Sequence, residues 1–230
     1  MRISFLIFPH VTQLDLMGPA QVLSRLPNAE IQLVAKTLAP VPTDSGFPIH
    51  PTHDFAAAGR PDILCVPGGF GTAAVMEDAE SLAWLREAAE TAQWVTSVCT
   101  GSLILGAAGL LRGYRATCHW ASHEWLARFG AIPVKERVVF DRNRVSGGGV
   151  TAGIDFGLAL AAALAGEQAA RTIQLGLEYD PAPPFDSGAP DRADPAIVNG
   201  YRQLVARLVP DRAARYQAAA DRLNGDRAES

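Results

Sequence analysis

The sequence predicts an α/β fold in which one doubly wound, mostly parallel sheet is flanked by helices and followed by a C-terminal helical extension. Three observations predict it. Short apolar strands alternate with stretches of helical periodicity along the chain. Two of these strands end in turns of small residues. The 230 residues suit one large domain or two small ones. We expect about six strands, in line with the usual size of a sheet.

The expected strands are short runs rich in apolar residues. They are Arg2–Phe8, Glu30–Lys36, Ile63–Val66, Trp94–Val98, and a hairpin of Arg137–Phe140 and Arg144–Ser146. The first run is too short for a signal peptide and has no cleavage site, so we interpret it as a core strand.

The expected helices carry apolar residues at helical spacing. They cover Met17–Arg25, Glu77–Ala92, Gly101–Ala108, His119–Phe129, Thr151–Ala165 and Glu167–Tyr179, and a helical tail runs from Ala196 to Leu223. Pro19 would fall near the start of the first helix, where proline is tolerated.

Residues 1–180 are expected to form the main domain. Residues 181–230 form an extension, packed on the same domain or on the partner of a dimer. The connection Pro181–Pro195 is polar and rich in proline. It is either a surface excursion or a segment that wraps a partner subunit.

The composition excludes several classes of protein. With 20 Lys and Arg against 24 Asp and Glu, the net charge is −4, which argues against nucleic-acid binding. The apolar stretch Phe156–Gly166 is too short to span a bilayer, so no membrane association is expected. Cys65, Cys99 and Cys118 lack the close pairing of a disulfide framework or a zinc site. We expect a cytoplasmic enzyme or binding domain without a metal.

Cys99 has the sequence context of a reactive cysteine. It follows an apolar strand, lies between Ser97 and Gly101 in Ser-Val-Cys-Thr-Gly, and precedes a helical pattern. Small residues around a nucleophile suit the sharp strand-to-helix turn called a nucleophile elbow. The start of the next helix would favour the thiolate. The alternative is a buried, inert cysteine, which is the reading we prefer for Cys65 and Cys118.

A thiolate needs a proton partner, and the candidates are Asp15, His119, His123 and Asp155. Asp15 follows the first strand and could equally be a helix N-cap. His119 could be a satisfied core histidine, and Asp155 a structural residue within a helix. The turn Pro67–Gly71 offers several backbone amides but lacks the lysine and spacing of a phosphate loop. Spacing alone does not choose among these residues.

Four stretches together resemble the DJ-1/PfpI superfamily, whose fold is shared with class I glutamine amidotransferases. They are "QLDLMGPAQVL", "ILCVPGGFG", "VTSVCTGSLILGAAGLLRGYRATCHW" and "VSGGGVTAGIDFGLALAA". Two departures matter: Asp15 stands where chaperone and deglycase branches have glutamate, and Thr100 stands where protease-like members have histidine. The segment after residue 179 is too short and not basic enough for the DNA-binding module of related regulators. Together with "LGLEYDPAPPFDSGAP", the motifs are most similar to the branch that hydrates isonitriles.

This resemblance implies an enzyme that adds water to an isonitrile, R–N≡C, to give an N-substituted formamide. Cys99 is implied as the nucleophile, Asp15 as acid and then base, and Thr100 as a residue that orients Asp15 or the water. The backbone amides of Gly69 and Phe70 are expected to support charge. The resemblance implies a homodimer and no cofactor. The alternative is a cysteine-based redox or stress sensor, or a deglycase-like member of the superfamily.

Overall fold

The computed structural model describes residues 1–225 and contains a seven-stranded central sheet with the order β10-β11-β7-β6-β1-β2-β5. All its neighbouring strands run parallel except the hairpin pair β10 and β11. The strands are β1 (Arg2–Leu6), β2 (Glu30–Ala35), β5 (His53–Asp54), β6 (Ile63–Val66), β7 (Trp94–Val98), β10 (Val138–Asp141) and β11 (Arg144–Gly147). The predicted fold class is confirmed, and the six predicted strands are all present.

The sheet is buried on both faces because helices cover each of them. Along β1 and just beyond it, Ile3, Phe5 and Ile7 belong to one apolar core, whereas Leu6 and Phe8 belong to the other. Alternation of this kind follows from the two-residue period of a strand. In a parallel sheet both sets of side chains are apolar, which explains why the strands appear in the sequence as short apolar runs.

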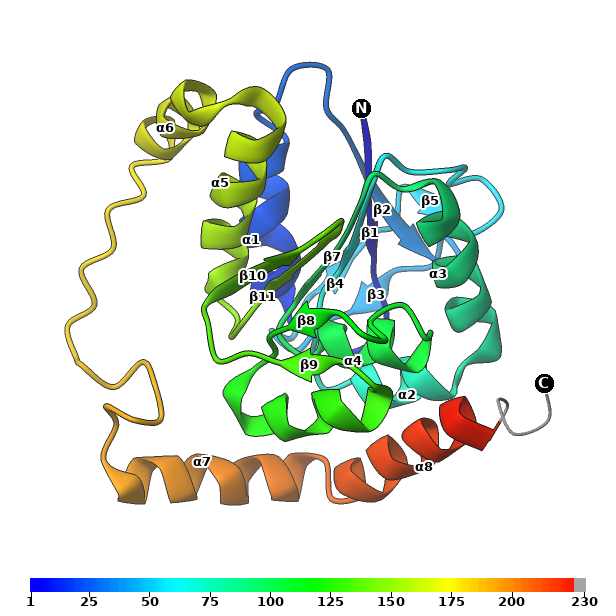
Figure 1. Cartoon of the computed structure of the whole chain (residues 1–230), viewed down its shortest axis with the longest axis vertical. Coiled ribbons are helices and arrows are strands. Elements are labelled where there is room, and N and C mark those ends of the chain that lie inside the picture. The colour runs from blue at the N-terminus through cyan, green and yellow to red at the C-terminus, as the bar shows by residue number, and fades with distance from the viewer. Residues whose placement is uncertain (226–230) are drawn as a thin grey trace.

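The helices form two layers, as Figure 1 shows. One face of the sheet carries α1 (Gln13–Leu23), α5 (Ala152–Ala165) and α6 (Glu167–Gly176). The other face carries α2 (Thr72–Glu77), α3 (Ala79–Thr91), α4 (Gly101–Ala107), the 3₁₀ helix η1 (Trp120–Phe129) and α8 (Arg212–Gly225). Two small sheets lie outside these layers: β3 (Val41–Pro42) with β4 (Pro48–Ile49), and β8 (Arg115–Ala116) with β9 (Ile132–Pro133).

Three helix boundaries differ from the prediction. Helix α1 begins at Gln13, so Pro19 lies inside the helix and packs against Gly153 of α5. The helix predicted over 77–92 is α3, which begins two residues later because the Asp78 carboxylate accepts a hydrogen bond from the Ser81 N–H and caps it; the short helix α2 before it is not predicted by the sequence. The C-terminal tail is likewise two helices, α7 (Pro195–Leu208) and α8, separated around Pro210.

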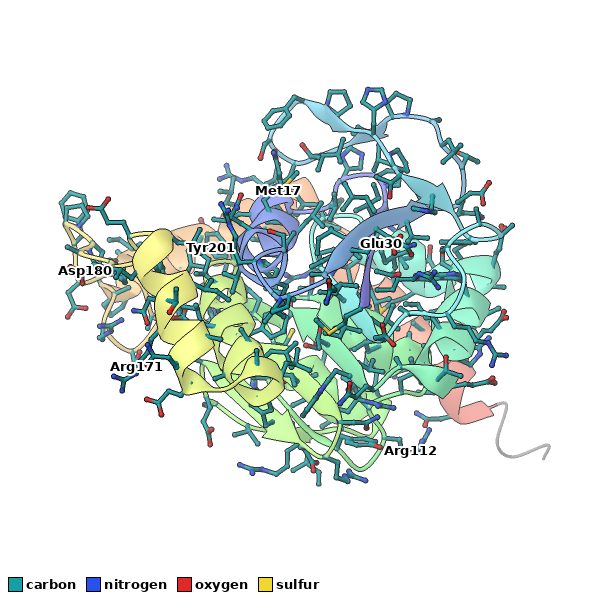
Figure 2. All side chains as sticks on the ribbon, turned by 90° about the horizontal axis from the view of Figure 1, so that it is seen from above. Met17, Glu30, Arg112, Arg171, Asp180 and Tyr201 are labelled. Atoms are coloured by element: carbon teal, nitrogen blue, oxygen red, sulfur yellow. The ribbon has the colours of Figure 1, made fainter. Side chains whose placement is uncertain are left out.

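The C-terminal helices α7 and α8 cross one end of the α/β fold. After α6 the chain has no regular structure up to Asp194; α7 then runs along the lower edge of the molecule and α8 continues beneath α2 (Figure 1). Helix α8 packs on α2, α4 and η1 and buries Tyr216, Ala219 and Ala220. In the view from above, Asp180 lies at the outer edge of the molecule, and Tyr201 of α7 is seen between it and α1 (Figure 2). Within residues 1–225, no helix combines the length and apolar character needed to cross a membrane.

Candidate active site

The candidate site lies at the carboxyl ends of β1, β6 and β7, which are neighbours in the sheet. The chain leaves β1 toward β2 and later places β6 on the opposite side of β1. Ligands bind at such a reversal of strand order in open α/β sheets. A bridge between Val11 and Gly69 joins the loops that follow β1 and β6. The topology therefore brings together three segments that are about 30 to 50 residues apart in the sequence.

Cys99 occupies a strained turn between β7 and α4. Its φ is +58°, a conformation that residues other than glycine rarely adopt. Its N–H donates to the Gly148 carbonyl oxygen at 2.8 Å, which holds the turn against the loop after β11. A Cβ at Gly101 would collide with the carbonyl oxygens of Val66 and Pro67, so a small residue is required there. The structure places the cysteine on the predicted kind of turn, and backbone strain at such positions is a mark of functional sites.

Asp15 is not a helix cap. Thr12 holds the N-cap position of α1, and Asp15 lies in the first turn with its side chain directed across to the loop after β6. Its Oδ2 accepts a hydrogen bond from the Gly68 N–H at 2.9 Å. Its Oδ1 is buried without a hydrogen-bond partner among residues 1–225. Asp15 is 1% exposed, and only one of its two carboxyl oxygens has a hydrogen-bond partner. Burial of such a group lowers the stability of the fold, so a functional role explains its presence better than a structural one.

The proton affinities of Asp15 and Cys99 are both raised. Burial raises the pKa of Asp15 to about 7, although the Gly68 N–H and the Cys99 thiol lower it in part. Burial also raises the pKa of the Cys99 thiol well above its ordinary value, and the Asp15 charge adds to this shift. The stabilisation of the thiolate expected from the start of α4 is thus outweighed. At pH 7 the thiol is protonated and the carboxyl is about half ionised, so the pair approaches a single shared proton as the pH rises above 7.

Thr100 is fixed by hydrogen bonds to the turn Pro67–Gly71 after β6, called the glycine loop below. Its Oγ1 accepts from the Gly69 N–H at 3.0 Å and lies 2.7 Å from the Thr72 Oγ1. The Thr72 hydroxyl donates to the Gly69 carbonyl oxygen, so the Thr100 hydroxyl is left to donate to Thr72. Thr100 therefore has one free acceptor position and no free donor. It makes no direct hydrogen bond to Asp15 within the described part of the chain.

The sequence predicts that the Gly69 and Phe70 amides support charge. In the structure the glycine loop instead uses the N–H groups of Gly68 and Gly69 to position Asp15 and Thr100. The Gly68 N–H is directed to Asp15 and the Gly69 N–H to Thr100, so the Gly69 amide is already engaged. A Cβ at Gly68 would collide with Thr100, which explains the need for glycine. Phe70 is 43% exposed, lines the cavity beside Cys99, and has a backbone N–H that forms no hydrogen bond within residues 1–225.

The cavity beside Cys99 has a volume of about 150 Å³, and the extension forms one of its walls. Five of its lining residues come from α7 and α8 and the turn between them: Tyr201, Val205, Val209, Arg212 and Tyr216. Sequence reasoning missed all five as site residues. Their spacing of three to four residues is the helical period, which predicts a packed face but does not identify what that face covers.

The other three candidates for the proton partner of Cys99 differ in their surroundings, and none of them suits that role. His119 lines the cavity and caps η1 through Nδ1, and burial with the nearby Arg212 lowers its pKa to about 4. It is neutral at physiological pH and cannot act there as a strong acid. Asp155 pairs with Arg137 and accepts from the Tyr179 hydroxyl, which is a structural role. His123 is bonded to the Val134 carbonyl oxygen and does not line the cavity.

The remaining cysteines do not border the cavity. Cys65 lies within β6, where its sulfur accepts from the Thr96 hydroxyl, and burial raises its pKa to about 12. Cys118 is also buried, with its pKa raised by the same cause. All three cysteines are free.

Comparisons with known proteins find relatives that match nearly the whole chain. The model of the DJ-1/PfpI family matches residues 1–163. The chain is 52% identical to an isonitrile hydratase of Pseudomonas putida over 224 residues, which cover 97% of this chain and 98% of that protein. A ThiJ/PfpI family crystal structure from Pseudomonas syringae has 45% identity and a TM-score of 0.90, with 95% of this chain and 90% of that one covered.

A more distant relative shows the limits of the common fold. A DJ-1 superfamily protein from Salmonella typhimurium matches with a TM-score of 0.70 and 23% identity. It covers 78% of this chain, whereas 98% of its own length is matched. The shared part is the α/β fold, and the strained cysteine turn lies within the span that the family model matches. On this sequence match and this fold, the chain belongs to the DJ-1/PfpI family.

Proposed function

We propose that this protein hydrates isonitriles, converting R–N≡C and water into an N-substituted formamide. The observation that carries the proposal is a buried carboxyl of raised pKa beside a cysteine on a strained turn. The relative of 52% identity that bears the name isonitrile hydratase supports the same reaction. The terminal carbon of an isonitrile accepts a nucleophile and a proton at one atom, which suits a thiol and a carboxyl that share a proton.

In the first step the carboxylate of Asp15 accepts the Cys99 proton as the sulfur attacks the terminal carbon. The neutral Asp15 then delivers that proton to the same carbon. The product is a thioimidate, R–N=CH–S–Cys99, and Asp15 is again ionised. Transfer from the thiol through Asp15 removes the need for a thiolate in the resting protein, where burial disfavours it.

In the second step Asp15 acts as base toward water, which adds to the thioimidate carbon. The abstracted proton passes to the nitrogen, the adduct loses the sulfur, and the hydroxyl proton returns to Cys99. The atoms balance to R–NH–CHO and the starting enzyme. Thr100 supports this step because its free acceptor position can orient the water. The Phe70 N–H is the remaining free amide of the glycine loop for charge that develops during addition.

The sensor alternative is less well supported by these properties. Peroxide oxidation of a cysteine proceeds through the thiolate and favours low-pKa, accessible thiols. Cys99 is 6% exposed and its pKa is raised. Asp15 in place of glutamate also separates this chain from the deglycase-like pattern.

The test follows the loss of the isonitrile stretch by infrared spectroscopy, with the formamide product identified by mass spectrometry. A simple alkyl isonitrile and an aryl isonitrile serve as substrates. We expect turnover by the natural protein and by Cys65→Ser, and turnover at least 100-fold lower in Cys99→Ser, because a serine hydroxyl is poorly ionised. Absence of turnover in the natural protein, or activity of Cys99→Ser within tenfold of it, would contradict the proposal.

We further propose a cytoplasmic homodimer. The three free cysteines support a reducing compartment. Two-fold pairs are the commonest soluble oligomers, and an exposed apolar stripe on α7 supports an interface there.

A further inference from the structure

One cationic side chain lines the site cavity, and among residues 1–225 it has no carboxylate partner. Arg212 lines the cavity together with Cys99, yet among residues 1–225 no carboxylate lies within 4.0 Å of its guanidinium. Its hydrogen bonds are long: 3.3 Å to the Ser122 Oγ and 3.4 Å to the Ala121 carbonyl oxygen. Five N–H donors are available on an arginine, so most of its capacity is unused.

Packing of the extension uses only part of this side chain: its two long hydrogen bonds reach η1, and its guanidinium lies 6.0 Å from the centre of the Tyr216 ring. Arg212 begins α8, where the helix dipole disfavours a positive charge. The neighbouring Arg215 has an evident structural role, since it pairs with Glu77 across the interface between α8 and α2. Arg212 has no such carboxylate partner.

The charge acts on the interior of the cavity. Arg212 lowers the pKa of His119 and opposes the burial-driven rise in the pKa of Tyr201. The pKa of Tyr201 also responds to Cys99, so this phenol is within electrostatic reach of both the nucleophile and the guanidinium. Arg212 is therefore part of the field that a substrate attached to Cys99 would experience.

The other titratable groups of the cavity do not compete with Arg212 for an anion. His119 is neutral at physiological pH, and Tyr201 and Tyr216 have raised pKa values. Asp44 lies on the wall formed with Thr12, is exposed, and accepts hydrogen bonds from the Gln13 N–H and the Ser45 hydroxyl. Its charge disfavours an anion on that side of the cavity and leaves the Arg212 side as the favourable one.

The rest of the lining is largely apolar. Ala73, Val150, Val205 and Val209 supply aliphatic surface, and Phe70 and the two tyrosines supply aromatic surface. An apolar linker would suit these walls, with a single anionic group at the cationic position. One guanidinium in a cavity of about 150 Å³ matches a carboxylate, which it binds through two parallel hydrogen bonds, better than a larger dianion such as phosphate.

We infer that the substrates of this enzyme are isonitriles that carry a carboxylate, which Arg212 binds while Cys99 attacks the isonitrile carbon. This inference rests on the proposed hydratase function and specifies its substrate class. Arg212 is then a specificity-determining residue contributed by the extension. Its role is to orient the substrate, and it takes no part in the covalent steps.

The test compares ω-isocyano carboxylates, with linkers of two to five methylenes, with their neutral methyl esters. The natural protein is expected to prefer the acid in kcat/KM for at least one linker length. Arg212→Gln should lower the acid-to-ester ratio of kcat/KM by about 10- to 100-fold, the range of hydrogen bonds to charged groups. Arg212→Lys should retain part of the preference because it keeps the charge but loses the two-pronged geometry.

Arg207→Gln is the matched control, since it makes the same change in charge at an exposed position of α7 outside the cavity. The ratio should stay within twofold in this variant. Equal losses for acid and ester in Arg212→Gln would assign the residue a structural role and overturn the inference. A ratio that does not change in Arg212→Gln, or no preference for the acid at any linker length, would overturn it as well.

A second measurement separates this inference from the proposed function. Binding of an ω-formamido carboxylate and its methyl ester to Cys99→Ser is measured by calorimetry, with and without Arg212→Gln. Arg212-dependent binding of the acid supports the anion site even if no isonitrile is turned over, in which case only the hydratase proposal fails. Turnover of simple isonitriles without Arg212-dependent binding leaves the hydratase proposal standing and overturns the carboxylate site.

Discussion

At the scale of single residues, the site depends on two acids whose environments oppose ionisation. Asp15 and Cys99 are both buried; the Asp15 charge raises the pKa of the Cys99 thiol, whereas the thiol lowers the pKa of Asp15 in part. Above about pH 7 such a pair holds one proton, which can move between oxygen and sulfur without exchange with solvent. The reaction proposed above needs this property, because the same proton leaves the thiol and arrives at the substrate carbon.

Activity should fall as the pH falls below about 7. Protonation of Asp15, whose pKa is about 7, removes the base that accepts the Cys99 proton, so kcat/KM should decline tenfold for each further pH unit.

Asp15→Asn should lose about 10²- to 10⁴-fold in turnover at pH 8, since an amide can neither accept nor deliver the proton. Asp155→Asn, which changes a carboxylate outside the cavity, is the control. Turnover of Asp15→Asn near the natural rate would exclude the carboxyl from the chemistry.

Asp15 should also make the fold less stable as the pH rises. The unfolded chain ionises this group near pH 3.8, whereas the folded protein does so near pH 7. Between these values the folded state binds more protons, so the Asp15 contribution to the free energy of unfolding falls as the pH rises and is constant above the window. The Asp15→Asn variant lacks this pH-dependent contribution to the free energy of unfolding, because asparagine does not ionise. Its melting temperature relative to the natural protein should therefore be higher at pH 8 than at pH 4, and the reverse order would argue against a raised pKa.

Thr100→Val should lower both activity and stability. The resemblance implies that the Thr100 hydroxyl orients Asp15 or water, and the structure shows that the same hydroxyl also accepts a hydrogen bond from the Gly69 N–H. Loss of that acceptor should cost about 1–3 kcal/mol of unfolding free energy. Thr72→Val is the control, because it removes a hydroxyl of the same network that does not line the cavity. Denaturant unfolding and turnover, measured on both variants, test whether activity falls further in Thr100→Val, as its proposed contact with water requires.

At the scale of elements, the site is built from turns whose residues have almost no steric freedom. The glycine loop after β6 and the Cys99 turn after β7 touch through Gly68, Gly69 and Gly101. The inner strands β1, β6 and β7 could be predicted because their apolar runs reflect burial on both faces. The start of α1 at Gln13 could not, because Asp15 resembles a helix cap and Pro19 an early helix position, and only the contact with α5 shows otherwise.

Gly101→Ala should destabilise the protein and abolish activity together. The new methyl group would meet the backbone carbonyl oxygens of Val66 and Pro67, which cannot move without distorting the end of β6. Gly176→Ala is the matched control at the end of α6, where an added Cβ has no neighbour within 4 Å. That variant should keep full activity and be equal or up to about 1 kcal/mol more stable, since alanine loses less backbone entropy on folding. Thermal melts of the two variants should move in different directions.

At the scale of the whole molecule, the extension after the main domain completes the cavity. The sequence predicts its helical character and the exposed connection before it, because Pro181–Pro195 is polar and proline-rich. It does not predict that Val205, Val209 and Tyr216 approach Cys99, because periodicity identifies the apolar face of a helix but not its partner. Contacts between segments about 100 residues apart depend on tertiary packing, which no local pattern encodes.

The last prediction concerns assembly through α7. Its buried residue Val205 faces the cavity, while Ile197, Leu204 and Leu208 are 58%, 43% and 56% exposed at helical spacing. A stripe of apolar side chains left in water is typical of an interaction surface. If a second copy of the chain covers it, sedimentation should give the mass of a dimer at micromolar concentration. Leu204→Asp together with Leu208→Asp should then give the monomer mass.

Leu175→Asp is the control for that experiment, because Leu175 is 82% exposed on α6 and outside the α7 stripe. It should leave the dimer intact. The α7 double variant should also lose turnover. Helix α7 carries Tyr201 and Val205 of the cavity wall, and without the partner subunit this helix should be held less firmly against the rest of the chain. A monomeric natural protein would overturn the dimer, and a dimer that survives both aspartates would move the interface away from α7.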